Sequence, residues 1–251
     1  MSRILLVILS ICILSGTDST SLRAENIFQK IARIGGNPDK HKNDSIAAPK
    51  STPGKNSKSK KGNYADTTDP FELSLDENLA LPHIGDKQKS TVTAYMNEVA
   101  KKLAQRKVAR IETMRAGEVV IATIGTDLLF APNDTVLRST APEILSPYRS
   151  LLSRGIYKFV ITCHTDDTGS ASYTDHLSEA RVNAIESWLS RNLPAETVIV
   201  PYALGASEPL YLNDSQSHRA SNRRIEIFIV PDERLIDLAK SGKLSDKGIS
   251  K

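Results

Sequence analysis

Cysteine, aromatic residues and long apolar runs are all scarce in this chain of 251 residues. Aromatic residues make up 5% of the chain and hydrophobic residues 39%, which is lean for one continuous core of this length. The two cysteines, Cys12 and Cys163, are too few for a disulfide-rich scaffold or for a zinc site with four cysteine ligands. No apolar run reaches about 18 residues, so we expect no ordinary membrane-spanning helix.

The positive charge of the chain is concentrated in one short stretch. Seven lysines and two aspartates lie between Asp39 and Lys61, so this stretch has a net charge of +5. The whole chain has a net charge of +4, which leaves about −1 for all other residues. A nucleic-acid-binding domain should carry its positive charge on a folded surface. The distribution therefore argues against nucleic acid as a partner.

The N-terminus has the pattern of an export signal. Arg3 precedes Ile4–Leu14, which is apolar except for one serine, and this combination is typical of a signal peptide of about residues 1–24. The cleavage position is open, and a buried N-terminal strand is the alternative interpretation. The residues before Cys12 partly resemble a lipobox, so lipidation at Cys12 is a second possible route to the envelope.

The next two segments differ sharply in composition. Residues 25–68 are rich in Lys, Ser and Pro, and almost nothing in them can be buried, so we expect a disordered linker. Residues 69–115 are expected to be a helical segment, because the apolar positions of Asp86–Arg106 follow the spacing of one amphipathic stripe. This helix would pack on the following domain or on a partner. Its stripe consists of Val92, Met96, Val99 and Leu103.

Residues 116–232 have the pattern of a small α/β domain, and residues 233–251 are expected to be a C-terminal tail. Apolar and β-branched runs predict four strands, at Glu118–Ile124, Tyr157–Cys163, Val198–Leu204 and Arg224–Val230. Helical patterns occupy Thr140–Ser153 and Ser172–Asn192. The order β-α-β-α-β-β predicts right-handed crossovers and a small mixed sheet with helices on one face.

The densest polar cluster is His164–Ser170, between a strand and a helix. Ligands gather at the carboxyl ends of strands in such sheets. Asp166 precedes Arg181 by 15 residues, and together they offer a carboxylate for an ammonium group and a guanidinium for a carboxylate. This pair would suit a zwitterionic ligand. The alternative is a salt bridge that only joins the loop to the helix.

Catalytic and metal-binding interpretations are weaker. Ser170 and Ser178 lie in no nucleophile-elbow pattern, and Cys163 ends a strand where packing is its expected role. A metal set would have to combine His164, Asp166 and His176, which lack the spacing of a metal site. We therefore expect no catalytic residue, no metal and no cofactor.

Several ordered motifs over about 115 residues resemble one known family. They are Phe130-Ala-Pro-Asn133, His164-Thr-Asp166-x-Thr168-Gly-Ser170, Tyr173, Leu177-Ser178-x-x-Arg181, Gly205-Ala-Ser-Glu-Pro209 and Arg219-Ala-Ser-Asn222-Arg223-Arg224-Ile-Glu-Ile227. This set strongly resembles the peptidoglycan-binding domain at the C-terminus of outer-membrane protein A.

The resemblance implies a non-catalytic module that binds the peptide stem of peptidoglycan through diaminopimelate. Asp166 would contact the zwitterionic end of that side chain, and Arg181 would pair with its carboxylate. The remaining pocket residues would be Thr168, Asn133, Thr174, Asn222 and Arg223. Two positions depart from the family pattern: Thr174 stands where Asn is frequent, and Ala131 where Asp is usual. Thr174 is shorter and has one donor fewer, so affinity or stem-peptide preference would differ.

The resulting prediction is an exported protein in the periplasm or outer membrane of a Gram-negative-type envelope. It would tether the cell wall to the outer membrane or to an envelope complex. The alternative is a scaffold component of a larger envelope machine, in which wall binding is secondary. A flagellar stator subunit is disfavoured, because Ile4–Leu14 is too short to span a membrane and carries no acidic residue.

Overall fold

The computed structural model describes residues 69–245 and 248–249. The predictions for the signal peptide, the linker and Cys12 lie outside these residues. Within them, no helix combines the length and the apolar character that crossing a membrane requires.

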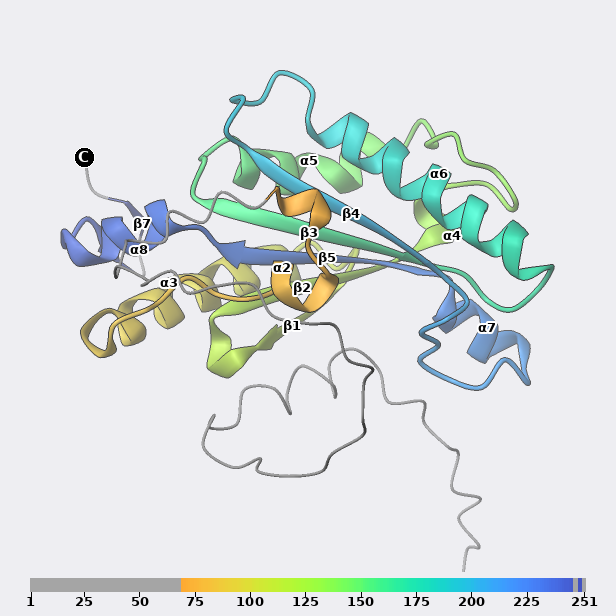
Figure 1. The fold of residues 1–251 in the computed structure, drawn as a ribbon, viewed down its shortest axis with the longest axis horizontal. Helices are drawn as coiled ribbons and strands as arrows, with labels where there is room; N and C mark the ends of the chain where they lie inside the picture. Colours follow the sequence, from red (N-terminus) through yellow and green to blue (C-terminus); the bar gives the residue numbers. More distant parts are fainter. Residues whose placement is uncertain (1–68, 246–247, 250–251) are drawn as a thin grey trace, which may run out of the picture.

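The core of the described chain is a five-stranded mixed sheet with the order β1-β2-β5-β3-β4 (Figure 1). Its strands are β1 (Arg110–Met114), β2 (Val119–Gly125), β3 (Tyr157–His164), β4 (Val198–Gly205) and β5 (Arg224–Pro231). β3 and β4 are parallel, and the other neighbours are antiparallel. The central strand β5 is buried along its whole length, which is why its sequence is almost continuously apolar.

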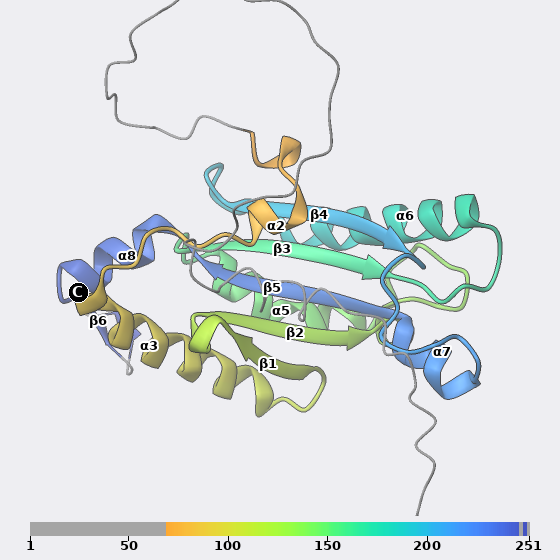
Figure 2. The same ribbon diagram turned by 60° about the horizontal axis from the view of Figure 1, so that its bottom comes forward.

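The larger apolar core lies between one face of the sheet and four helices. These are α3 (Asp86–Ala104), α5 (Ala141–Leu152), α6 (Ala171–Leu189) and α8 (Glu233–Lys240). Figures 1 and 2 show α5 and α6 running along that face, and α3 beside α8 at one end of the molecule. The predicted α/β fold with a small mixed sheet and helices on one face is confirmed.

The opposite face of the sheet carries a smaller apolar cluster. Leu79 and its neighbours cover Val119, Val160 and Phe228 there. Leu79 follows α2 (Leu75–Asn78), a single turn whose Ser74 and Glu77 form a reciprocal capping box. The short 3₁₀ helix η1 (Pro70–Glu72) precedes it. The start of the described chain is therefore part of the fold.

Two expectations about the ends of the domain are wrong. The sheet has a fifth strand, β1, within the segment expected to be helical; its side chains are largely exposed and partly charged, so it lacks an apolar pattern. The residues after 232 are not simply a tail. They form α8, whose Leu235 and Ile236 are buried, followed by the short β6 (Leu244–Ser245) and β7 (Gly248–Ile249). The periodic face of α3 packs on the domain's own core.

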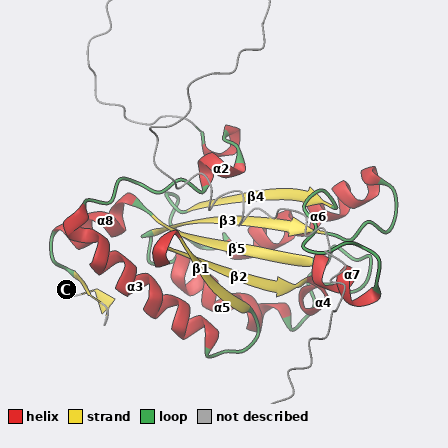
Figure 3. Ribbon diagram, turned by 90° about the horizontal axis from the view of Figure 1, so that it is seen from below, coloured by secondary structure: helices red, strands yellow, loops and turns green. Residues whose placement is uncertain are grey.

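One end of the sheet gathers the segments that form the candidate site. β2, β3 and β4 all end there, and β5 begins there (Figure 3). Two short helices lie at the same end, α4 (Thr126–Leu129) after β2 and α7 (Gln216–Asn222) before β5. The η2 turn (Arg115–Gly117) lies between β1 and β2.

Candidate functional site

A cavity of about 270 Å³ opens at this end of the sheet. That volume lies near the lower end of the range of ligand pockets, about 300–1,000 Å³, so it suits one side-chain terminus better than a large cofactor. Its walls come from α4 and the turn after it, the loop after β3, the first turns of α6 and the start of β5. Six of the seven residues predicted from the sequence line it: Asn133, Asp166, Thr168, Thr174, Arg181 and Arg223.

Asp166 is held by two donors from different segments. Arg223 Nη1 donates to Asp166 Oδ2 at 2.6 Å, and the Thr168 amide donates to Oδ1 at 3.0 Å. Burial alone would raise the pKa of the Asp166 carboxyl, but these donors outweigh it, and the pKa lies below its ordinary value. Asp166 is therefore ionised at neutral pH. The loop-to-helix salt bridge considered for Asp166 and Arg181 does not form, because Arg223 takes that place.

Arg181 lies on α6 and is only 4% exposed. Its Nε donates to the Asp134 carbonyl at 2.8 Å and its Nη2 to the Ala131 carbonyl at 3.3 Å. The guanidinium carbon lies 5.2 Å from the centre of the Phe130 ring. Within the described part of the chain, Arg181 forms no ion pair. Its direct contacts are with neutral groups, while the Asp134 carboxylate, which accepts from the Thr135 and Val136 amides, attracts it only at longer range. A buried charge without a direct ion pair is costly, and an anion in contact would stabilise it.

The hydroxyl of Thr165 also lacks a partner. Thr165 is buried and lines the cavity, and its Oγ1 makes no hydrogen bond within the described residues. The Thr174 hydroxyl, by contrast, donates to the Ala171 carbonyl at 2.9 Å inside α6. Of these two threonines, Thr165 is the one whose hydroxyl has no hydrogen-bond partner in the described residues. Its amide donates to the Gly205 carbonyl at 2.8 Å, which fixes it at the end of β3.

Asn222 is the predicted site residue that does not line the cavity. Its side chain is fully buried and accepts from the Leu210 and Tyr211 amides at 2.8 and 3.0 Å. It also donates to the Tyr211 carbonyl and to Asn213 Oδ1, both at 2.8 Å. These four bonds use its amide to anchor the loop after β4. Asn222 therefore supports the fold, while the neighbouring Arg223 reaches the cavity.

Sequence reasoning missed several residues of the cavity wall. Thr165 and Tyr173 lie within the quoted motifs but received no role, and Asp127 on α4 was not marked at all. Asp127 comes just after β2, so the rule that ligands gather at strand ends could have found it. Polar residues are more frequent in the loop after β3 than after β2, so the loop after β3 is the stronger signal in the sequence.

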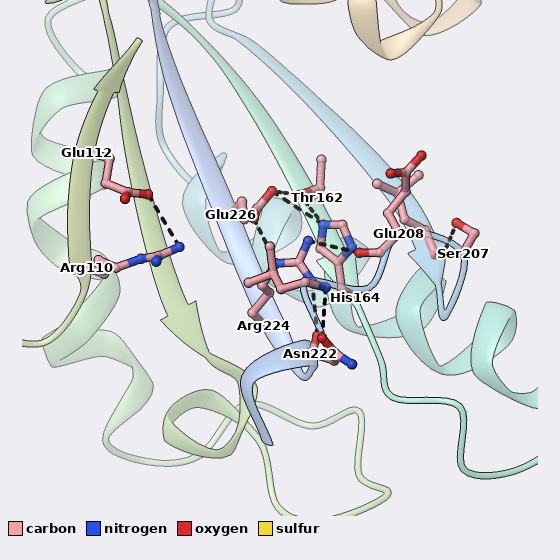
Figure 4. A network of polar contacts seen from close by, with 11 residues as sticks. Arg110, Glu112, Thr162, His164, Ser207, Glu208, Asn222, Arg224 and Glu226 are labelled. Atoms are coloured by element: carbon pink, nitrogen blue, oxygen red, sulfur yellow. Dashed lines mark hydrogen bonds and ion pairs between the residues drawn. The ribbon is translucent and has the colours of Figure 1, made fainter. Parts of the chain in front are cut away.

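A buried ionic cluster lies on the sheet behind the cavity (Figure 4). Arg224 Nε donates to Glu226 Oε1 at 2.8 Å, and its Nη groups donate to the Asn222 and Glu208 carbonyls at 3.4 and 3.1 Å. Glu226 Oε2 is 3.5 Å from His164 Nε2, which is 3.0 Å from the Thr162 hydroxyl. The cluster thus ties the end of β3 to the start of β5, directly beside Asp166 and Arg223.

The charges of this cluster balance within the fold. Burial alone would raise the pKa of Glu226, but the hydrogen bond from His164 and the charge of Arg224 lower it to about 2. Burial lowers the pKa of His164, so its ring is neutral at neutral pH. Its Nδ1 has no partner within the described residues. One cation and one anion therefore neutralise each other behind the cavity.

The weaker chemical interpretations find no assembled site in the described residues. His176 is an exposed residue that pairs with Glu179, remote from the buried ring of His164, and no group of three His, Cys, Asp or Glu side chains is placed to hold a metal there. Cys163 is fully buried, and burial raises the pKa of its thiol to about 12. The Ser178 hydroxyl donates to the Asp175 carbonyl and accepts from the Gly205 amide.

Comparison with known proteins shows a similarity over part of the chain. Residues 129–223 match the model described as OmpA family. Two curated relatives are a lipoprotein YfiB of Escherichia coli (strain K12), 30% identical over 104 residues, and the outer-membrane lipoprotein YfiB of Pseudomonas aeruginosa, 36% identical over 86 residues. The matches cover 41% and 34% of this chain, and 65% and 50% of those proteins. The chain thus spans less than two thirds of either relative.

The solved structures that resemble the chain include a MotB-like protein from Desulfovibrio vulgaris. It is 22% identical, with a TM-score of 0.49, and the match covers 59% of this chain and 94% of that one.

Proposed function

We propose that this chain, whose residues 129–223 form an OmpA-family domain, binds peptidoglycan non-covalently through the zwitterionic end of the diaminopimelate side chain. The observation that carries the proposal is Arg181, a buried guanidinium at the wall of a small cavity that forms no direct ion pair with a carboxylate of the described residues. The cavity also holds the ionised Asp166 and the unpartnered hydroxyl of Thr165. It therefore offers both charges that a zwitterion needs.

The chemistry of the two ligand groups fits these partners. A carboxylate would accept from the remaining N–H groups of Arg181, which compensates the buried charge. Thr165 Oγ1 is a second donor in the wall, without a hydrogen-bond partner in the described residues. An ammonium group requires a carboxylate, and the cavity wall contains Asp127 and Asp166.

The proposal assigns no catalytic role. The hydroxyl of Ser178 serves the backbone, and the Cys163 thiol is buried with a raised pKa, so neither is an activated nucleophile. The protein would act as an anchor that holds the wall and releases it unchanged.

The proposed location is the periplasm or outer membrane of a Gram-negative-type envelope; the relative from Pseudomonas aeruginosa is an outer-membrane lipoprotein. We retain the division of the chain predicted from the sequence: an export signal in residues 1–24, or lipidation at Cys12, followed by a tether in residues 25–68. Intact-mass measurement of protein extracted from the envelope tests this division. A mass of the full unmodified chain would contradict both export routes.

The test of the function compares Arg181→Gln with Arg191→Gln, an exposed position just beyond the same helix. Affinity for a diaminopimelate-containing muropeptide and for purified sacculi is measured beside the melting temperature. A charged hydrogen bond contributes roughly 1.5–3 kcal/mol, so Arg181→Gln should weaken binding about 10- to 100-fold. Arg191→Gln should bind like the parent. A folded Arg181→Gln variant with parental affinity would remove the basis of the proposal.

A further inference from the structure

The geometry points to Asp127 as the residue that binds the ammonium group of the ligand, a role that no sequence motif assigns to it. This inference rests on the proposed function, because it concerns the second charge of the same zwitterion. It assigns the ammonium to α4, whereas Asp166 lies in the loop after β3.

Asp166 is poorly suited to be the main partner of a cation. Both of its carboxylate oxygens already accept a hydrogen bond, one from Arg223 at 2.6 Å and one from the Thr168 amide at 3.0 Å. The positive charge of Arg223 lies directly against the carboxylate and repels an approaching ammonium group. In this arrangement Asp166 positions Arg223 and the loop after β3.

Asp127 lines the same cavity with its charge uncompensated. Its side chain makes no hydrogen bond or ion pair within the described part of the chain, although its backbone carbonyl accepts from Arg138 Nε at 3.0 Å. The cavity wall then holds two cations, Arg181 and Arg223, and two anions, Asp127 and Asp166. One cation–anion pair is internal, and the remaining pair, Arg181 and Asp127, matches the two charges of a zwitterion.

The position of α4, the helix that carries Asp127, is fixed by hydrogen bonds to a neighbouring segment. The Thr126 amide and hydroxyl both donate to the Arg223 carbonyl, at 3.1 and 3.3 Å, so α4 is attached to the start of β5. The Asp127 carboxylate folds back over Gly125: a Cβ atom on that residue would lie 2.6 Å from Asp127 Oδ1. Gly125 has an ordinary negative φ, so alanine is compatible with its backbone and would displace only this flexible carboxylate.

Two probes test the inference. One is a stem tripeptide whose diaminopimelate side chain has a free amine, and the other is the same peptide with that side-chain amine acetylated. The parent should prefer the free amine about tenfold, as expected for one charged hydrogen bond. Asp127→Asn should lose that preference while binding the acetylated peptide like the parent. Gly125→Ala should reduce the preference without changing any charge. Glu143→Gln, an exposed acid on α5, is the matched control and should keep it.

The outcomes separate this inference from the proposed function. If Asp127→Asn keeps the preference and Asp166→Asn loses it, the inference is overturned while the proposed function stands. If the parent binds neither peptide, or Arg181→Gln binds both like the parent, the proposed function itself fails. Because the Asp127 side chain is exposed and forms no hydrogen bond or ion pair with the described residues, its variant should melt at the same temperature as the parent, and a change in preference cannot then be attributed to unfolding.

Discussion

Replacing Glu226 with glutamine should destabilise the fold far more than the loss of an exposed ion pair does. Glu226 is 0% exposed and Arg224 is 2% exposed, and their 2.8 Å contact is the charge compensation of that arginine. The Asn222 and Glu208 carbonyls would still accept from the guanidinium, but its ion pair with Glu226 would be lost. Breaking a buried pair by removing one partner costs about 3–5 kcal/mol.

The matched control is Glu112→Gln on the edge strand of the same sheet (Figure 4). Glu112 lies 3.4 Å from Arg110, and their side chains are 43% and 52% exposed. Exposed pairs contribute about 0–1 kcal/mol, because water screens both charges. The two substitutions are chemically identical and differ mainly in burial, so their difference measures the effect of desolvation.

Equilibrium urea unfolding and thermal melting provide the measurement. For a domain of about 150–250 residues, 1 kcal/mol shifts the melting temperature by about 2–4 °C, so Glu226→Gln should melt about 6–20 °C lower and Glu112→Gln within about 4 °C of the parent. If the two variants lose similar stability, the buried cluster does not act as a charge-compensating pair, and the argument fails.

The pH dependence follows from the same group. The pKa of Glu226 falls to about 2 in the fold, below its ordinary value of 4.5, so its carboxylate contributes stability above the unfolded pKa. That contribution is lost as the pH falls through the interval between those two values. The stability gap between the parent and Glu226→Gln should therefore be constant above about pH 5 and narrow below it. A gap that stays constant down to pH 2.5 would contradict the assigned pKa direction.

Three further variants or treatments probe other parts of the structure. Gly205 has a φ of +48°, and a Cβ atom there would meet a carboxylate of α6, whereas Gly242 has a φ of +70° and no atom within 4 Å of such a Cβ. Gly205→Ala should therefore lower the free energy of unfolding more than Gly242→Ala, which paired urea titrations would measure. Leu235→Ala should cost about 2–5 kcal/mol and the half-buried Leu238→Ala less, which chemical denaturation would show if α8 belongs to the core. Cys163 should resist iodoacetamide at pH 8 until the protein is unfolded, and rapid native labelling followed by mass spectrometry would contradict its burial.

The periodicity of the sequence predicted the elements whose burial is one-sided or complete. β3 and β5 are long apolar runs, and α3 and α6 carry regular stripes, so their positions differ from the prediction by only a few residues. β1 and α8 were missed for a physical reason. The charged residues Arg110 and Glu112 give β1 the sequence pattern of a loop. α8 has only eight residues, so its apolar positions are too few to be distinguished from a polar tail.

The sequence indicated which residues line the cavity but not which of their charges form an ion pair. The polar loop at the end of β3 and the spacing to α6 correctly indicated that Asp166 and Arg181 share one cavity. The actual partner of Asp166 is Arg223, 57 residues further along the chain, and only the pairing of β3 with β5 brings them together. Local spacing contains no information about that contact. The assignment of ligand roles to these residues stays a prediction.

The two consecutive arginines explain why the cavity and the buried cluster adjoin. Arg223 ends α7 and reaches the cavity, whereas Arg224 begins β5 and lies beside Glu226, two residues further along the same side of the strand. Each of these arginines has a carboxylate of its own within 3 Å. Arg181 is the one of the three that forms no ion pair in the described chain: backbone carbonyls accept its hydrogen bonds, and the Asp134 carboxylate attracts it only at longer range. Because the fold pairs the other two arginines directly, the missing partner of Arg181 supports the proposal that a negative group of a ligand binds there.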